Sequence, residues 1–239
     1  MALSELEQQD IPSEAALLAG AAHDLGNHIA AIQGFSELLL MPDLDLDLDH
    51  RRNFSEKINQ LSIELLQQFR NLVDFSKIAS TGLELDLSTV CMDQLINERL
   101  LHFAAQAEKK NIVLHFSSSC HLSLQLDLLR MQQVVDQLLS NAIKFSPCGS
   151  RIDVRLFAAT EEIVFSVHDQ GEGISKEEQA QLFSTLHCLS TKPTEGEFGL
   201  GLGLALSKQI VMAHNGVINV RSELAEGACF SVVLPRSTG

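Results

Sequence analysis

The stretch that most constrains the fold is Gly199-Leu200-Gly201-Leu202-Gly203-Leu204, in which three glycines alternate with three leucines. An apolar run with helical character follows directly, over residues 205–214. Glycine has no Cβ atom, so the backbone here can approach a ligand closely and adopt positive φ. A helix that begins just after such a loop offers free N–H groups and the positive end of its dipole. The stretch therefore predicts a loop that holds phosphate oxygens.

The composition indicates a soluble, acidic, globular chain. Its 239 residues suffice for one large domain or two modest ones, and 45% of them are hydrophobic, enough for a buried core. The formal net charge is −14 with no cluster of Lys and Arg, which argues against nucleic acid as a partner. No apolar run approaches the length of a membrane span. The five cysteines lack CxxC spacing and are typical of free thiols. We therefore expect a cytoplasmic protein without a membrane segment.

Two long helices are predicted in the first third of the chain, at residues 14–40 and 51–79. Apolar residues recur in both at alternating steps of three and four, as in a coiled-coil seam. Pro42 ends the first helix, and Asp49 is the expected cap of the second. A two-helix hairpin has too little interior to bury both seams, so we expect a homodimer in which two hairpins form a four-helix bundle. The alternative is a hairpin that covers its seams with the C-terminal domain.

The pattern changes after Gly82, which predicts two domains: a helical hairpin at 1–82 and a domain of mixed helices and strands at 83–239. The fold class is therefore α+β. Strands are expected at 83–87, 112–116, 122–126, 151–157, 163–167, 217–222 and 229–234, and helices at 92–110, 127–145 and 202–214. Residues 170–200 are rich in Gly, Ser, Thr and Glu and predict a long loop, which in a compact domain is often a functional lid.

One face of the predicted helix at 127–145 carries polar groups suited to a metal and phosphates. Gln137, Asn141 and Lys144 lie at positions i, i+4 and i+7, so they share a helical face. Two amide oxygens and an ammonium group can serve a hydrated Mg²⁺ ion and its phosphates. The GxxxxGK[ST] pattern is absent, so the site is not a P-loop.

An acidic residue and two glycines follow the predicted strand at 163–167. The carboxylate of Asp169 can accept a hydrogen bond from an exocyclic amine, which would select adenine. Gly171 and Gly173 allow a base to lie close to the backbone. The long loop then carries Phe183 and Lys192 as candidate nucleotide contacts. For these two residues, an anchor for the lid and a solvated surface charge are the respective alternatives.

The first predicted helix contains a candidate phosphoacceptor. His23 follows the seam position Ala22, so it should lie at the edge of the seam, accessible to solvent. Neutral imidazole is a competent nucleophile near physiological pH. Asp24 can accept a proton from one ring nitrogen while the other attacks phosphorus. Asn27, one turn later, can orient a water molecule for the reverse reaction. The other eight histidines lack this setting and are expected to be structural or surface residues.

In this order, the segments around His23, Asn141, Asp169, Phe183 and Gly199–Gly203 resemble the H, N, G1, F and G2 boxes of sensor histidine kinases of two-component systems. The resemblance covers nearly the whole chain. It implies a HisKA-type dimerisation and phosphotransfer hairpin in a dimeric four-helix bundle. An α/β-sandwich ATP-binding domain would follow, with the Bergerat fold that DNA gyrase, the HSP90 chaperones and the MutL proteins share.

The resemblance also implies roles for single residues. Asn141, with Gln137, would bind Mg²⁺, Lys144 would contact phosphate, and Asp169 would bind the adenine amino group. The other residues implied for the ATP site are Phe145, Gly171, Gly173, Ile174, Phe183, Lys192, Gly199, Leu200, Gly201, Leu202 and Gly203. Two departures stand out: Gln137 replaces a common Asn, and Cys229 occupies a position near the adenine where Thr is common.

The expected function is autophosphorylation of His23 with Mg²⁺ and ATP, followed by transfer to an aspartate of a response-regulator receiver domain. The protein would also act as a phosphatase of that partner through Asn27. Two alternatives stay open: a non-catalytic phosphotransfer or docking adaptor with a vestigial nucleotide domain, and a protein that is chiefly a phosphatase. A gyrase- or chaperone-type ATPase is disfavoured, since the chain has no room for transducer domains. A separate sensor domain or protein would supply the signal.

Overall fold

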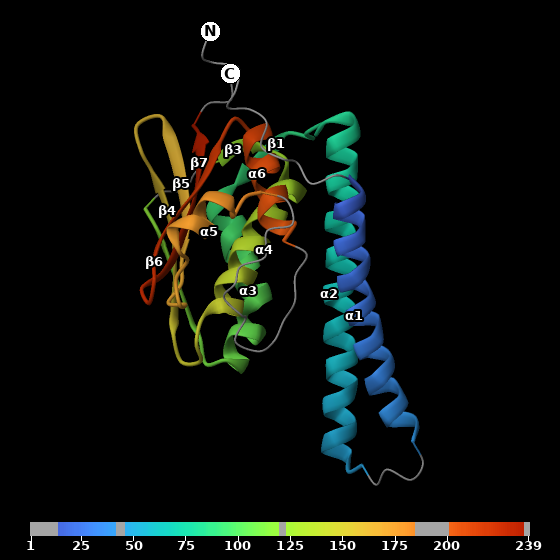
Figure 1. The fold of residues 1–239 in the computed structure, drawn as a ribbon. Helices are drawn as coiled ribbons and strands as arrows, with labels where there is room; N and C mark the ends of the chain where they lie inside the picture. Colours follow the sequence, from blue (N-terminus) through green and yellow to red (C-terminus); the bar gives the residue numbers. More distant parts are fainter. Residues whose placement is uncertain (1–13, 42–45, 120–122, 185–200, 237–239) are drawn as a thin grey trace. The chain divides into compact units, whose positions relative to one another are not determined.

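The structure, a computed structural model, describes residues 14–41, 46–119, 123–184 and 201–236. The chain divides into two compact units, Met1–Ser80 and Thr81–Gly239. The first consists of helices, and the second combines a sheet with helices (Figure 1). This is the predicted succession of a helical region and an α/β domain.

The first unit is a hairpin of two helices, α1 (Glu14–Leu40) and α2 (Leu48–Thr81). Contacts between them include the rings of Phe35 and Phe54, which lie 5.5 Å apart, and His28 Nε2, which lies 3.6 Å from Glu64 Oε2. Phe35 and Phe54 both lie near the hairpin tip, and His28 and Glu64 both lie farther from it. The two helices are therefore antiparallel. The predicted hairpin is therefore present.

The start of α2 differs from the prediction. The N–H of His50 donates to Oδ1 of Asp47 at 2.8 Å, so Asp47 provides the cap. The prediction of Asp49 is wrong because the alternating Asp-Leu pattern of the link offers several carboxylates, and the helix begins earlier than its apolar spacing indicates. The carboxylate of Asp47 has a pKa below its usual value, chiefly because it accepts this backbone hydrogen bond.

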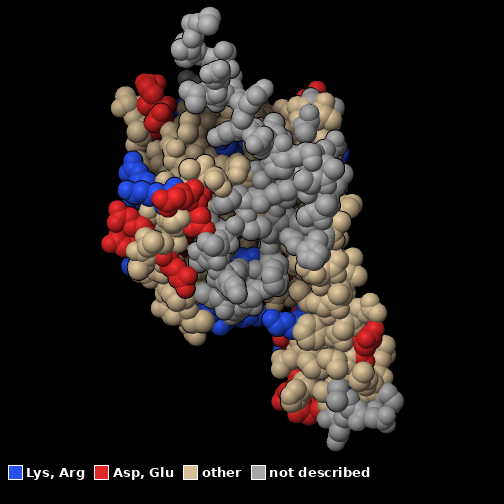
Figure 2. Space-filling view, in the orientation of Figure 1, with Lys and Arg blue, Asp and Glu red and all other residues tan. Residues whose placement is uncertain are grey.

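The hairpin leaves much apolar surface uncovered. Among its described side chains only His28 and Gln68 are buried, and neither is apolar. Ile63, Leu66 and Phe69 on α2 are each more than half exposed, at 60%, 55% and 54%. Uncharged residues make up most of the described hairpin surface in Figure 2. A second apolar surface is needed to bury these side chains.

The second unit is built from a five-stranded sheet and a layer of helices. The strands are β1 (Ser88–Cys91), β2 (Val113–Ser118), β3 (Ser123–Leu126), β4 (Arg151–Ala158), β5 (Glu162–His168), β6 (Val217–Glu223) and β7 (Gly227–Pro235), and the helices are α3 (Met92–Lys109), α4 (Leu128–Phe145), α5 (Lys176–Gln181) and α6 (Gly203–Ala213). The sheet order is β2-β4-β5-β7-β6, antiparallel except for the pair β2–β4, and β1 pairs with β3 separately.

The core lies between the sheet and helices α3, α4 and α6, which cover one face (Figure 1). Alternate residues of β4, namely Ile152, Val154 and Leu156, are fully buried against this layer. The residues between them are more exposed, as expected for a sheet with one solvated face. In this layer, the carboxyl end of α4 and the start of α6 lie beside the carboxyl end of β5 and the start of β7.

Two element predictions are wrong. The described residues at 83–87 form no strand, and the first strand begins at Ser88, where pairing with β3 starts. The loop predicted at 170–200 contains a short helix, α5. Its signal was present in the sequence as a capping box: Ser175 Oγ accepts from the N–H of Glu178, and the Glu178 carboxylate accepts from the N–H of Ser175.

Both ends of α4 are held by buried polar groups. At its start, one carboxylate oxygen of Asp127 accepts from Arg130 N at 3.0 Å, and the N–H of Asp127 donates to His214 Nε2 at 3.0 Å. At its end, Lys110 is buried and its Nζ donates to the carbonyl oxygens of Ile143, at 2.7 Å, and Lys144, at 3.1 Å. The ammonium thus satisfies carbonyl groups that have no partner within the helix.

The substitution Lys110→Met is expected to lower the free energy of unfolding by about 2 kcal/mol, because it leaves buried carbonyls without a charged donor. Urea denaturation measures the effect. The matched control is Lys109→Met, which removes an exposed neighbouring cation and should cost only a few tenths of a kcal/mol. Equal losses in the two variants would contradict the capping role.

Candidate active site

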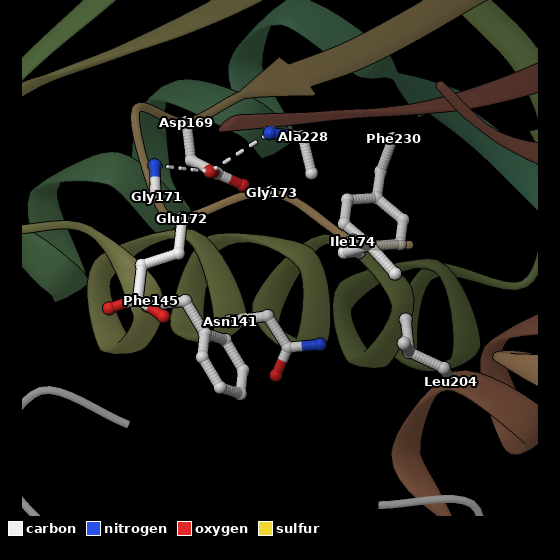
Figure 3. A pocket seen from close by; sticks show the side chains of 10 residues that line it. All are labelled: Asn141, Phe145, Asp169, Gly171, Glu172, Gly173, Ile174, Leu204, Ala228 and Phe230. Carbon is white, nitrogen blue, oxygen red and sulfur yellow. Dashed lines mark hydrogen bonds between the residues drawn. The ribbon is translucent and has the colours of Figure 1, made fainter. Parts of the chain in front are cut away.

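A pocket of about 400 Å³, partly open to solvent, lies in the second unit. It is formed by the end of α4, the loop after β5, the start of α6 and the start of β7 (Figure 3). The residues that line it are Asn141, Phe145, Asp169, Gly171, Glu172, Gly173, Ile174, Leu204, Ala228 and Phe230. Six of them belong to the predicted site: Asn141, Phe145, Asp169, Gly171, Gly173 and Ile174.

Asp169 is a buried carboxylate at the back of the pocket, directly after β5. Its Oδ1 accepts from the N–H groups of Gly171, at 2.8 Å, and Ala228, at 3.1 Å. The other carboxylate oxygen points into the pocket (Figure 3). Burial raises the pKa of Asp169 above its ordinary value, and the two N–H groups oppose part of that rise. The residue therefore offers a fixed acceptor to a ligand.

The loop after β5 lies tightly against the turn that joins β6 and β7. Gly173 has φ +77°, and a Cβ atom there would lie 2.0 Å from the carbonyl oxygen of Glu223. The N–H of Ala225 donates to the carbonyl oxygen of Glu172 at 2.7 Å. Only glycine fits at position 173, and this close contact forms one wall of the pocket.

We expect Gly173→Ala to cost about 3 kcal/mol or more, since it combines a left-handed conformation with a clash against backbone. Gly149→Ala is the matched control: Gly149 has φ +78°, but the space around it is open. The control should lose only about 1 kcal/mol. Thermal unfolding of both variants distinguishes the two contributions, and similar losses would show that the contact with Glu223 is unimportant.

Two amide side chains connect α4 with the start of α6. Asn141 and Phe145 lie on the side of α4 that faces the pocket (Figure 3). Gln137 Nε2 donates to Asn141 Oδ1 at 3.0 Å. The Gln137 amide also rests on Gly203, where a Cβ atom would lie 2.0 Å from Gln137 Oε1. Asn141 Oδ1 keeps a second lone pair, so it is still available to a cation.

The donors at this end of the pocket fit Mg²⁺ only in part. Among the described residues no group of three or more His, Cys, Asp or Glu side chains is arranged to hold a metal. A magnesium ion commonly keeps several waters and takes one or two protein oxygens together with substrate phosphates. The amide oxygen of Asn141 suits that arrangement, in which the nucleotide supplies further ligands. Gln137, also predicted as a metal ligand, does not line the pocket, and its Oε1 lies against Gly203.

The other predicted ATP contacts lie elsewhere. Lys144 is half-buried, with Nζ 6.0 Å from the centre of the Phe145 ring, and does not line the pocket. Phe183 is half-buried after α5 and does not line it either. Gly201 and Leu202 directly precede α6, which begins at Gly203. Lys192, Gly199 and Leu200 lie outside the described residues.

Four pocket residues were missed in the sequence: Glu172, Leu204, Ala228 and Phe230. The last two alternate on β7, so strand periodicity was the available signal. Cys229, which the resemblance places near the adenine, is not among the pocket residues. Ala228 lines the pocket, and the Cys229 Sγ lies 3.9 Å from Ser231 Oγ.

The candidate phosphoacceptor lies in α1, and the side chains of His23 and Asp24 lie outside the described part of the chain. Asn27 and Ala30, one and two turns later on the same helical face, are exposed. His28 is buried against α2 and paired with Glu64. Among the described helices, none combines the length and apolar character that crossing a bilayer requires.

Two family models match the chain. Residues 13–81 match the "His Kinase A (phospho-acceptor) domain", and residues 126–238 match the "Histidine kinase-, DNA gyrase B-, and HSP90-like ATPase". The first range contains His23, and the second contains the entire pocket.

Relatives and solved structures agree with these matches. The chain is 29% identical to the circadian input-output histidine kinase CikA of Synechococcus elongatus, over 92% of this chain and 30% of that protein. It is 26% identical to the sensor histidine kinase YcbM of Bacillus subtilis, over 93% of this chain and 71% of that protein. The histidine kinase ThkA, solved in complex with the response regulator TrrA, shares the fold at a TM-score of 0.68 and 23% identity, over 93% of this chain and 61% of that one. Together the two matches identify a sensor histidine kinase core, with a phosphoacceptor domain at residues 13–81 followed by an ATPase domain at residues 126–238.

Proposed function

We propose that this chain transfers the γ-phosphoryl group of ATP to His23 and then to an aspartate of a response-regulator receiver domain. The observation that carries the proposal is the buried Asp169 carboxylate in a pocket that also contains Asn141 and Phe145. That pocket is accompanied by the sequence His23-Asp24 in a matched phosphoacceptor domain. The chain spans 30% of CikA, and a separate sensor domain or protein that supplies the input is part of the proposal.

Adenine would bind between the loop after β5 and the carboxyl end of α4. Its 6-amino group would donate to the pocket-facing oxygen of Asp169, while the other oxygen stays held by Gly171 and Ala228. Ile174 and Phe230 supply the apolar walls. Leu204 lines the pocket from α6, so the N–H groups at the start of that helix are close enough to receive the phosphates.

Asn141 would hold Mg²⁺ by its amide oxygen, and Gln137 would support this by positioning the Asn141 amide. The ion would offset the negative charge of the phosphates. The chain's own contribution is to position these groups: Gln137 orients the Asn141 amide and rests on Gly203. These two contacts of Gln137 fix the position of the Asn141 amide relative to the start of α6. Lys144, Lys192 and the glycine loop at 199–203 are proposed as phosphate contacts, and Phe183 as an anchor at the edge of the site.

In the phosphoryl transfer a His23 ring nitrogen would form a bond to the γ-phosphorus while the bond from that phosphorus to the β–γ bridging oxygen breaks. ADP leaves with the bond's electron pair. Asp24 would accept the proton of the other ring nitrogen and so keep the attacking nitrogen nucleophilic. The catalytic effect would come mainly from positioning and electrostatic stabilisation, as in other phosphoryl transfers.

The receiver domain would then take the phosphoryl group onto an aspartate oxygen, and the N–P bond of phosphohistidine would break. Asn27 is exposed one turn from His23, where its amide can orient a water molecule for hydrolysis of a phosphorylated partner. ThkA, which shares the fold, has been solved with a response regulator. These features support a kinase with a second, phosphatase activity.

Dimerisation through the hairpin is part of the proposal. A single hairpin leaves Ile63, Leu66 and Phe69 more than half exposed, and no apolar side chain among its described residues is buried. A second hairpin would cover this surface in a four-helix bundle. Light scattering should give a dimer at micromolar concentration, and a monomer would contradict the bundle.

Phosphotransfer profiling tests the function. The chain is labelled with γ-³²P ATP and presented to a panel of receiver domains, with His23→Gln and Asn27→Ala variants beside the wild type. We expect rapid transfer to a small subset of receivers. Loss of dephosphorylation in Asn27→Ala, with labelling retained, would support the phosphatase role. ATP binding without any labelling would favour the non-catalytic adaptor.

A further inference from the structure

A continuous chain of hydrogen bonds runs behind the pocket through Ser222, at the end of β6. Ser222 Oγ accepts from the N–H of Ile174 at 2.9 Å. The same hydroxyl donates to the carbonyl oxygen of Gly227 at 2.5 Å. One side chain therefore joins the loop after β5 to the first residue of β7.

The peptide unit between Gly227 and Ala228 extends this chain to the pocket. Its carbonyl oxygen accepts from Ser222, and its N–H donates to Asp169 Oδ1 at 3.1 Å. A trans peptide unit is planar, so the orientation of its carbonyl group sets the direction of its N–H group. The φ of Gly227 is +81°, and a Cβ atom there would lie 2.1 Å from the carbonyl oxygen of Asp169. The unit is thus held closely against the carboxylate residue.

Gln179 joins α5 to the same chain. Its Nε2 donates to the carbonyl oxygens of Ile174, at 2.7 Å, and Ser222, at 2.9 Å. Ile174 is itself a wall of the pocket, and the capping box at Ser175 begins α5 directly after it. A displacement of α5 would therefore break bonds that hold both the wall and Ser222.

We propose that Ser222 is a positioning residue for adenine recognition, acting on the Asp169 carboxylate through the Gly227–Ala228 peptide unit. The proposal rests on the proposed function, in which Asp169 accepts from the adenine 6-amino group. Hydrogen bonds in series polarise one another. A hydroxyl that donates to the Gly227 carbonyl strengthens the donor at the other end of the unit, which then holds Oδ1 and leaves Oδ2 directed at the base.

Removal of the Ser222 hydroxyl would loosen this arrangement without touching the ligand. The N–H of Ala228 would then donate a weaker hydrogen bond to Oδ1. Because this hydrogen bond lowers the pKa of Asp169, which burial raises, the pKa would rise further in the variant. A protonated carboxyl group is a poorer acceptor. As the pH falls, the variant should therefore lose adenine binding first, at a higher pH than the wild type.

Calorimetric titration with two nucleotides tests the proposal: ATP, and purine riboside 5′-triphosphate, which lacks the 6-amino group. For Ser222→Ala we expect ATP affinity to fall about five- to tenfold, the usual effect of one lost hydrogen bond. The affinity for the purine analogue should change less than about twofold. Ser222→Thr, which keeps the hydroxyl, should retain most of the wild-type preference. Ser231→Ala on β7 is the matched control, since Ser231 lies outside the pocket and the hydrogen-bond chain.

Equal losses for both nucleotides in Ser222→Ala would assign Ser222 a merely structural role and overturn the proposal. A wild type that binds the two nucleotides equally would instead refute the role of Asp169 itself. Gln179→Met provides a second test if Ser222→Ala fails to fold. It should also weaken ATP more than the analogue, and an equal effect on the two would contradict the proposal.

Discussion

The variant His23→Gln should incorporate less than about one hundredth of the wild-type acid-labile phosphate when incubated with γ-labelled ATP and magnesium. The reason is chemical: the glutamine amide nitrogen is not nucleophilic, so no N–P bond forms. Because the ATP pocket lies in the other compact unit, ATP affinity should be unchanged. Filter binding after alkaline and acid treatment measures the phosphate.

His102→Gln is the control for this variant. His102 is an exposed histidine on α3, outside the pocket and outside the phosphoacceptor domain. It should be labelled as well as the wild type. Full labelling of His23→Gln, or equal loss in both variants, would show that the phosphoryl group goes to another residue.

A second large effect is expected at Asp169. Asp169→Asn should weaken ATP binding about 30- to 100-fold, because an amide cannot serve the two backbone N–H groups and the adenine amino group with oxygen acceptors at once. An N–H group would then face another N–H group in a buried position. Calorimetric titration with ATP measures the loss.

The pH dependence of ATP binding supplies a further check on this variant. The pKa of Asp169 is raised by burial, so in the wild type ATP binding should weaken as the pH falls through that raised value. The Asn variant has no such group and should lack this acid limb. Asp153→Asn, a change on β4 outside the pocket, is the control and should keep both the affinity and the acid limb. An unchanged acid limb in Asp169→Asn would assign the titration to another residue.

The helices and most strands could be predicted because their residues follow simple periods. The helix at 14–40 has the predicted bounds, and β4 and β5 differ from the prediction by only one residue at an end. Two errors arose where the sequence offers signals that local pattern alone cannot rank. Asp47 and Asp49 are both suitable caps, and the residues at 83–87 alternate like a strand but have no pairing partner among the described strands.

Pocket residues could be predicted where they belong to a short motif, with the neighbours that identify them close by in the sequence. Asn141 lies on the polar helical face that was predicted, and Asp169 precedes two glycines, so both were found from the residues, whereas Phe145 was found only through the resemblance to histidine kinases. Ala228 and Phe230 were missed because they enter the pocket from a strand far along the chain. Strand periodicity places them on one face of β7, and the tertiary structure shows that this face lines the pocket. Ser222 was missed for the same reason: its partners, Ile174 and Gly227, are brought together by the fold.

Mapping of the labelled residue tests the central claim most directly. The wild-type chain is incubated with magnesium and ATP labelled in either the α or the γ position, digested at neutral pH, and analysed by mass spectrometry for phosphopeptides. We predict label from γ-labelled ATP only, on the peptide that contains His23, stable in base and labile in acid. Label from α-labelled ATP, or γ-label on a peptide without His23, would contradict the account.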